Sequence, residues 1–447
     1  MKRFKFVQTD AEIISHGGLS LIGQAVKKYT SLSQELDKSI ALRHGIKHSD
    51  VMKAYLGLLS TGKNDFEAIN TIDSEFYFMN AMGLNSIPGE ATLRQRMDQK
   101  AVAFLPIAER ASIDFLCRVK PVLTPVFTGH LPLDADVTPM DNSGSHKEGV
   151  SRTYKGQDGY APMGVYLGQE GYCLRMELRE GKQHCQKDTP ALLARALQDA
   201  RRITDQPILL RLDGGNDSID NIDVILEHRQ QHLDAAEVDF IIKWNPRRVD
   251  KEEWLQRAEQ ESCWDYPRDG KRTAIFSETV NRQWNGYDYQ VRRVIRLSER
   301  SIDKHGQALL IPEIELEGWW TSLDRQESDV IKLYADHGTS EQFHSEFKTD
   351  LDIEQLPSGK FATNALVLAM SVLAYNILRW IGQNGLIKPG ASKRSQVKRR
   401  RIKTVMQELM YLAARVCKTS RTIQLSFGKG CKVFDVMDNL YQRLAYG

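Results

Sequence analysis

The sequence lacks the cysteine spacing that a structural zinc site or a disulfide framework needs. Its 447 residues include only six cysteines, and no two of them form a CxxC pair. His184 stands directly before Cys185, but no further Cys or His lies close to this pair in the sequence. Structural zinc takes four ligands, so the pattern excludes a zinc finger. We expect reduced thiols, which are usual in cytosolic proteins.

A long uninterrupted apolar run is also missing. The most apolar stretch extends from Phe361 to Gly382, and four polar residues interrupt it: Asn364, Ser371, Asn376 and Arg379. Because polar groups are costly in lipid, we expect a buried core helix here and no membrane partner. The opening residues, MKRFKFVQTDAEIISHGG, also lack the apolar core of a signal peptide. Both absences predict a cytoplasmic protein.

What is present indicates a soluble globular chain with several domains. Hydrophobic residues make up 41% and charged residues 27%, which is ordinary for such proteins. The length exceeds what one typical core holds, so we expect roughly two to four domains.

The charge is small in total but uneven along the chain. The net charge is +3, yet residues 386–447 hold 14 Lys and Arg against 3 Asp and Glu. This tail therefore carries +11 on a body that carries −8. Nucleic acid is the partner that fits best, because Lys and Arg neutralise phosphates. A solvated basic face is the alternative.

The patterning divides the chain into five regions. Residues 1–124 predict short helices joined by Gly-containing turns, which fit a helix-turn-helix DNA reader and equally any small bundle. Residues 125–245 and 311–385 predict the two parts of a mixed α/β sheet. Residues 246–310 predict a β-rich insertion, with an Asn285-Gly286 turn before a long alternating strand. Residues 386–447 form a basic C-terminal region that we expect to be helical.

Three acidic residues take comparable places in the α/β part. Asp136 lies on the polar face of the strand LPLDADV, Asp213 ends the buried strand ILLRL, and Glu341 lies on a helix after the last strand. Reactive groups in open α/β sheets collect at strand ends. Each acid has a rival or another role: Asp134 competes with Asp136, Glu346 competes with Glu341, and Asp213 could cap the next helix, although Asp217 or Ser218 suits that role better.

Three carboxylates brought together need a cation, because like charges raise one another's pKa. Hard oxygen ligands of this kind select Mg²⁺ or Mn²⁺. Two such ions would activate a water or hydroxyl and stabilise the leaving oxygen of a phosphodiester. The three acids therefore predict a metal-dependent phosphodiester chemistry.

Tyr334, His337, Glu341 and Lys348 follow one another at steps of three, four and seven residues. On a continuous helix these steps place all four on one stripe. The stripe could be one wall of a site or an ordinary solvated face with a Glu–Lys pair.

With these motifs, the chain resembles a bacterial insertion-sequence transposase of the DDE type, with an RNase H-like fold. The subgroup signature is Tyr, two residues, Arg, three residues, Glu, six residues, Lys, and here His337 stands in the Arg position. The segments DADVTPMD and ILLRLDGGNDSIDNI resemble the regions of the first and second Asp. The C-terminal segment RRRIKTVMQELMYLAARVCKTSRTIQLSF is similar to the ends of the insertion-sequence 1380 group.

The resemblance implies a DNA transposase that binds terminal inverted repeats, cleaves them with Mg²⁺ (or Mn²⁺) as two ions, and joins them to target DNA. Asp136, Asp213 and Glu341 would be the catalytic and metal-binding residues. Tyr334, His337 and Lys348 would contact DNA. A homodimer would join two ends in a synaptic complex, and the bacterial protein would be nucleoid-associated when bound to DNA.

Two further groups are predicted to contact DNA. The densest basic patch contains Lys393, Arg394, Lys398, Arg399, Arg400, Arg401 and Lys403, and we expect it to hold phosphates. In the insertion, Trp284 with Arg292, Arg293 and Arg296 would engage a distorted DNA end, because an aromatic residue in the insertion of related enzymes stacks on a flipped base. Trp244, Trp319 and Trp320 are rivals for that role, and any one of them could be a core residue.

Two other functions stay open. A domesticated or inactive transposase would act as a DNA-binding protein or repressor, and the replacement of Arg by His337 leaves that possibility open. A metal nuclease of the same fold, without strand transfer, is the second alternative.

Overall fold

A computed structural model describes residues 3–232, 236–247, 249–284, 286–303, 305–387 and 397–446. The side chains of Trp284 and Tyr287 lie outside this description, as do Lys393 and Arg394. The prediction for these side chains therefore stays a prediction.

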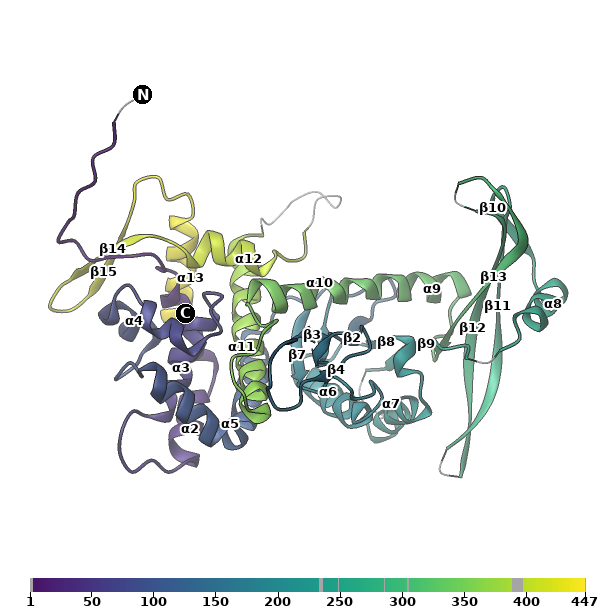
Figure 1. The fold of residues 1–447 in the computed structure, drawn as a ribbon, viewed down its shortest axis with the longest axis horizontal. Coiled ribbons are helices and arrows are strands. Elements are labelled where there is room, and N and C mark those ends of the chain that lie inside the picture. The colour runs from purple at the N-terminus through teal and green to yellow at the C-terminus, as the bar shows by residue number, and fades with distance from the viewer. Residues whose placement is uncertain are drawn as a thin grey trace.

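A nine-stranded mixed sheet runs from the middle of the molecule to its right-hand end in Figure 1, in the order β10-β11-β12-β13-β9-β8-β2-β6-β7. Its core strands are β2 (Leu131–Val137), β6 (Met163–Leu167), β7 (Tyr172–Glu177), β8 (Ile208–Leu212) and β9 (Val238–Trp244). β2 runs antiparallel to β6 and parallel to β8, which is itself parallel to β9. All five residues of β8 are buried, as expected for a continuous apolar strand covered on both faces. The predicted mixed α/β sheet is confirmed.

Helices flank this sheet. In the view of Figure 1, α6 (Thr189–Ile203) and α7 (Ile219–Gln231) lie below it, whereas α9 (Glu327–Ala335) and α10 (Ser340–Ser345) run above it. α11 (Phe361–Gly385) packs against β7 and against α5 (Glu90–Val119).

The polar residues that interrupt the apolar run of α11 all find partners inside the protein. The amide of Asn376 donates to the Cys173 carbonyl at 2.7 Å and accepts from its N–H at 2.9 Å, and Arg379 pairs with Glu346. Within the described residues α11 alone is long and apolar enough to cross a membrane, yet 83% of its most apolar window is buried in the molecule. The predicted core helix is confirmed.

The β-rich region is larger than predicted and is continuous with the central sheet. It contains α8 (Lys251–Glu261), β10 (Trp264–Arg268), β11 (Lys271–Trp284), β12 (Tyr287–Ile302) and β13 (Ala308–Thr321). β13 pairs with β9 through Gly318 opposite Trp244 and the three following residue pairs. The insertion therefore extends the core sheet outward, at the right of Figure 1.

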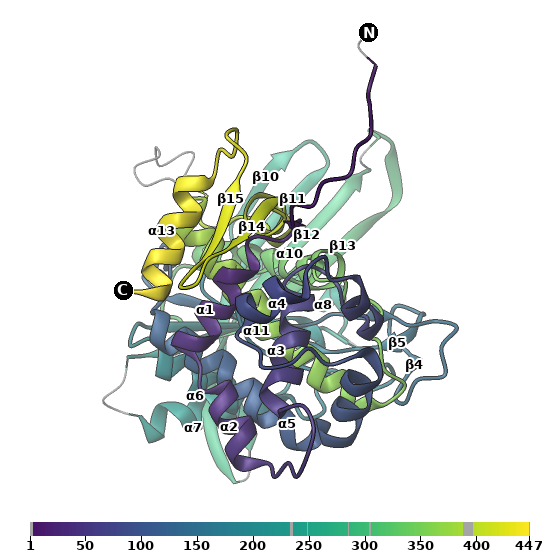
Figure 2. The same ribbon diagram turned by 90° about the vertical axis from the view of Figure 1, so that its left-hand side faces the viewer.

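The two ends of the chain fold together. The N-terminal part, which was expected to be helical, contains α1 (Leu19–Tyr29), α2 (Leu32–Ser39), α3 (His48–Leu59), α4 (Glu75–Met82) and α5. The C-terminal part contains α12 (Ile402–Val405), a hairpin of β14 (Ala414–Lys418) and β15 (Ile423–Phe427), and α13 (Phe434–Ala445). β1 (Ile13–Ile14) pairs with β14, and α13 packs on α1 (Figure 2). A purely helical C-terminal region was therefore wrong, because residues 414–427 complete a sheet with the first strand of the chain.

Candidate active site

Asp136 and Asp213 lie at the same edge of two neighbouring parallel strands. Ala135 of β2 stands opposite Leu212 of β8, so the residue that follows each of them is one of the two acids. Ser218 caps α7 by accepting a hydrogen bond from the N–H of Asp220 at 3.2 Å. Capping by Ser218 leaves Asp213 available for another role.

The two carboxylates influence one another. Burial and then the negative charge of Asp136 raise the pKa of Asp213, although Asn216 donates to Oδ1 of Asp213 at 2.7 Å and opposes this. Two half-buried carboxylates that repel one another are stabilised by a cation, and their oxygens are the donors that Mg²⁺ prefers. The chemistry of this pair therefore fits a divalent metal ion.

Two side chains on α10, the helix that carries Glu341, lie close to the Asp136 carboxylate. Its Oδ2 lies 3.4 Å from the hydroxyl of Ser340 and 3.4 Å from Nε2 of His344, while Nδ1 of His344 faces the hydroxyl of Tyr166 at 3.0 Å. Burial would raise the pKa of Asp136, but His344, His337 and the N–H of Val137 together outweigh this and the pKa is lowered. Sequence reasoning missed His344. Its position three residues after Glu341, on the same side of a helix, is the signal that could have identified it.

Glu341 is exposed on α10, between the two residues of that helix that reach Asp136. Its charge acts on Tyr154 together with those of Asp136 and Asp213, so all three acids belong to one region. In the part of the chain that the structure describes, no three Asp, Glu, His or Cys side chains already converge on a metal position. In the structure, Asp136 and Asp213 thus form a pair, and Glu341 is their neighbour.

Asp134, the rival of Asp136, is bound by Arg211 and His337. It is 2% exposed, and Arg211 donates to both of its oxygens at 2.6 and 2.7 Å. Nδ1 of His337 lies 3.0 Å from Oδ1 of the same carboxylate. Burial alone would raise the pKa of Asp134, but Arg211 and His337 hold it below its ordinary value. The Asp134 carboxylate therefore forms a buried ion pair that connects β2, β8 and the segment after α9.

The predicted row on one helix is not continuous. α9 ends at Ala335, a 3₁₀ turn covers Asp336–Thr339, α10 covers Ser340–Ser345, and a π-helical turn follows at Glu346–Asp350. Glu341 is exposed, whereas His337 is buried and Tyr334 and Lys348 are half-buried.

The side chains beside Glu341 in this row have partners within the protein. Tyr334 packs against Trp319 and His337, with ring centroids 6.1 and 5.6 Å apart. Lys348 donates to the Pro139 carbonyl and lies 3.6 Å from Glu354. Their DNA contacts, which the resemblance implies, stay predictions, whereas the expected stripe on one continuous helix is wrong.

The described part of the basic patch packs against the same helical segment. Arg399 contacts Glu346 and Gln342, Arg401 contacts Asp350, and Lys398 contacts Gln169. The Arg400 carbonyl accepts from Arg379 at 2.7 Å. Lys398, Arg399 and Arg401 line a cavity of about 530 Å³, with Asp134 and Arg211 also in its wall. Much of this positive charge is therefore used to fix the segment after Glu341.

The insertion arginines are also engaged. Arg293 lies between Trp244 and Trp320, 4.1 and 4.7 Å from their ring centroids, and contacts Glu278. Arg292 lies 2.6 Å from Glu327. Trp319 and Trp320 are each 2% exposed, so both are core residues. Arg296 pairs with Glu317, and the Trp284 side chain lies outside the described residues.

The family model for the transposase DDE domain, group 1, matches residues 2–446. The chain belongs to this family. DDE transposases are enzymes of DNA cleavage and strand transfer, and they generally use divalent metal ions. No curated protein matches the chain in sequence.

Among solved structures, this DDE family member is similar to a piggyBac transposase, determined by cryo-electron microscopy as a synaptic complex with hairpin DNA. The identity is 12%, the match covers 96% of this chain and 79% of the other, and the TM-score is 0.37. A likeness at that score carries no argument about the site.

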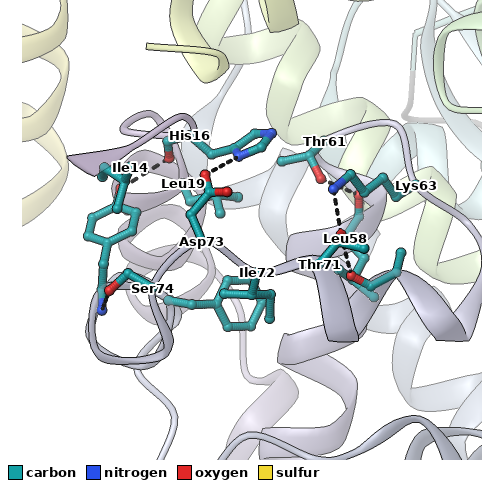
Figure 3. Close-up of a pocket in the computed structure, with 13 residues that line it drawn as sticks. Ile14, His16, Leu19, Leu58, Thr61, Lys63, Thr71, Ile72, Asp73 and Ser74 are labelled. Atoms are coloured by element: carbon teal, nitrogen blue, oxygen red, sulfur yellow. Dashed lines mark hydrogen bonds and ion pairs between the residues drawn. The ribbon is translucent and has the colours of Figure 1, made fainter. Parts of the chain in front are cut away.

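A pocket in the N-terminal helical part offers no second site for a transposase (Figure 3). Its volume is about 30 Å³, room for little more than water, and only residues 14–78 line it. His16 lies 3.7 Å from Asp73, and Lys63 donates to Thr71 at 2.9 Å, so its polar groups already pair with one another. A nucleotide does not fit there.

Proposed function

We propose that this protein is an insertion-sequence transposase that cleaves the ends of its element and joins them to target DNA. The observation that carries the proposal is the pairing of Asp136 and Asp213 at one edge of two parallel strands, with Glu341 beside them. The order β7-β6-β2-β8-β9, with β2 antiparallel to β6 and parallel to β8, supports an RNase H-like core.

Asp136, Asp213 and Glu341 would hold Mg²⁺ or Mn²⁺, as two ions. Bound there, the metal would neutralise charge on the phosphodiester and supply an activated nucleophile. The chain's own contribution is positioning: Ser340 and His344 fix Asp136, and Asn216 fixes Asp213. Such preorganised groups stabilise phosphoryl transfer electrostatically.

The proposed partners are double-stranded DNA at the terminal inverted repeats and at the target, and a second copy of the chain in a synaptic complex. Residues 1–124 would read the repeats, and the insertion and the tail would hold phosphates. The proposed location is the bacterial cytoplasm, at the nucleoid when DNA is bound.

The test uses the purified full-length protein and a donor duplex that carries the element's own ends. We expect cleavage and strand joining that require Mg²⁺ or Mn²⁺, lost in Asp136→Ala, Asp213→Ala and Glu341→Ala with end binding kept. Asp205→Ala, which removes an exposed carboxylate just after α6, is the matched control and should keep full activity.

Two outcomes would favour the alternatives. Specific end binding with no cutting in any divalent metal would favour a DNA-binding protein, a possibility that the burial of His337 in the Arg position leaves open. Cutting without any joined product would favour a nuclease.

A further inference from the structure

An exposed turn belongs to the small sheet that follows β2, and the transposase chemistry proposed for the three acids does not use it. It joins β4 (Ser151–Arg152) to β5 (Asp158–Tyr160), and its backbone is tightly fixed. The N–H and hydroxyl of Thr153 both donate to the Gln157 carbonyl, at 2.8 and 2.9 Å, and Gly156 N–H donates to the Thr153 carbonyl at 2.9 Å. Gly156 has φ +79°, a value that favours glycine.

The turn belongs to a small sheet, β3-β5-β4, that follows the strand carrying Asp136. β5 pairs with β3 (Met140–Asp141), which follows β2 directly, and Thr138 N–H donates to the Pro162 carbonyl at 2.9 Å. A Cβ on Gly159 would lie 1.9 Å from the Met140 carbonyl oxygen, so these strands approach as closely as backbones can. The turn therefore has a fixed position relative to the acids.

Tyr154, at the tip of this turn, is 70% exposed and cannot be a core residue. Partial desolvation, and then the charges of Asp136 and Asp213, raise the pKa of Tyr154 to about 12. The phenol therefore stays neutral at physiological pH, and the turn that carries it extends from the small sheet that follows the Asp136 end of β2.

Cationic side chains lie near the Tyr154 ring. Nζ of Lys155 lies 6.0 Å from the Tyr154 ring centroid, and Lys155 is exposed. Burial lowers the pKa of Lys348, Glu354 opposes this, and Lys155 adds to the lowering, so the two lysines lie within electrostatic range. Arg152, on the strand before the turn, is 70% exposed and only loosely paired with Asp158, at 3.5 Å.

An exposed aromatic ring beside flexible cations is the chemistry that binds single-stranded nucleic acid, with the ring stacking on a base and the cations holding phosphates. Carboxylates alone would repel a DNA strand, so cations beside them are needed to bring it in. Duplex DNA hides its base faces, whereas an unpaired nucleotide offers one.

We propose that Tyr154 stacks on an unpaired nucleobase next to the phosphodiester that is cut, and that Lys155 contacts an adjacent phosphate. The proposal rests on the proposed function, since it places a DNA strand at Asp136, Asp213 and Glu341. It adds a specific ligand, a single-stranded DNA nucleotide, at the β4–β5 turn.

The experiment measures binding without metal, so that it does not depend on cutting. The probe is the element's end as a duplex with a short single-stranded flank, carrying the fluorescent base 2-aminopurine at one flank position per probe. Stacking on Tyr154 should quench one position in the wild type, in Tyr154→Phe and in Tyr154→Trp, but not in Tyr154→Ala. Stacking on an aromatic side chain predicts a loss of affinity for the flanked probe of about five- to a hundred-fold in Tyr154→Ala, with affinity for the blunt duplex unchanged.

Phe127→Ala is the matched control, because Phe127 is a 53% exposed aromatic residue before β2, outside the regions proposed to hold DNA, and the change should alter neither quenching nor affinity. Equal binding of the flanked probe by wild type and Tyr154→Ala would overturn the proposal, and so would a loss in Tyr154→Phe as large as in Tyr154→Ala. Failure of cleavage in the metal assay would count against the proposed function alone, because base quenching is read with no metal present.

Discussion

Nδ1 of His337 lies 3.0 Å from Oδ1 of Asp134, on a carboxylate that Arg211 already holds at both oxygens. Arg211 also donates to the Leu333 carbonyl at 2.6 Å, near the end of α9. The ion pair of Asp134 and Arg211 therefore connects β2 and β8 to the segment that leads into α10. Asp134 and Asp136 are two residues apart, so the same strand carries a structural carboxylate and a candidate catalytic one.

Asp134→Asn should destabilise the protein. Removing one partner of a buried ion pair costs about 3 to 5 kcal/mol, because Arg211 would be left buried without its carboxylate. Differential scanning fluorimetry in metal-free buffer should show a clearly lower apparent Tm. Asp136→Asn is the comparison and should lower it much less, since no guanidinium among the described residues binds Asp136. An unchanged Tm in Asp134→Asn would contradict the structural role.

His337→Arg should not improve activity, although it restores the residue type of the family signature. His337 is 6% exposed, and a longer guanidinium would have to share Asp134 with Arg211. Forcing a larger side chain into a buried position costs about 1 to 3 kcal/mol. We expect a lower Tm and no gain in the rate of strand joining, measured beside a conservative His337→Gln. A faster His337→Arg enzyme would show that position 337 acts on DNA.

The sequence leaves Glu346 and Glu341 as rivals for the third catalytic acid. Substitutions of the two residues should differ clearly in their effect on the apparent Tm. Glu346 is 1% exposed and contacts both Arg379 and Arg399, whereas Glu341 is exposed. Glu346→Gln should lower the apparent Tm strongly, because it leaves two cations around an uncharged amide. Glu341→Gln should abolish cleavage with little change in Tm. A stable, inactive Glu346→Gln beside an active Glu341→Gln would reverse the assignment.

The sequence predicted those parts of the fold that local patterns determine. The apolar strand ILLRL and the alternating strand LPLDADV place Asp213 and Asp136 at strand ends, and their parallel pairing then brings the two acids together. The four polar positions in α11 identified a core helix rather than a membrane span.

The missed features depend on distant partners or on local breaks. The β14–β15 hairpin is stabilised by Ile13–Ile14, 400 residues earlier in the chain, and no local pattern shows this pairing. The row from Tyr334 to Lys348 assumed one ideal helix, but the 3₁₀ turn at Asp336–Thr339 and the π turn at Glu346–Asp350 change the phase of the side chains. His337 therefore turns inward to Asp134. Arg293 likewise has its position set by Trp244 and Trp320, which come from two other strands.

Asp239 provides a test of how pH acts on stability away from the site. It is 3% exposed on β9, where Nε2 of His130 lies at 3.0 Å, Ser322 donates at 2.6 Å and Arg229 donates at 2.5 Å. Burial alone would raise its pKa, but the hydrogen bonds from His130 and Ser322 and the charge of Arg229 hold the pKa of Asp239 below its ordinary value. A lowered carboxyl pKa means that the unfolded chain binds a proton before the folded one does as the pH falls.

The stabilisation from Asp239 should therefore be fully present above the unfolded pKa of about 3.9 and should be lost as the pH falls below it, through the folded pKa. Asp239→Asn should have a much lower apparent Tm than wild type between pH 5 and pH 7, and the difference should shrink as the pH falls from about 4 to 3. Scanning calorimetry of both proteins across this range measures it. Asp435→Asn, which removes an exposed carboxylate, is the control and should follow wild type, because an exposed charge contributes little to stability. A gap between wild type and Asp239→Asn that stays constant down to pH 3 would show that the carboxylate charge does not contribute.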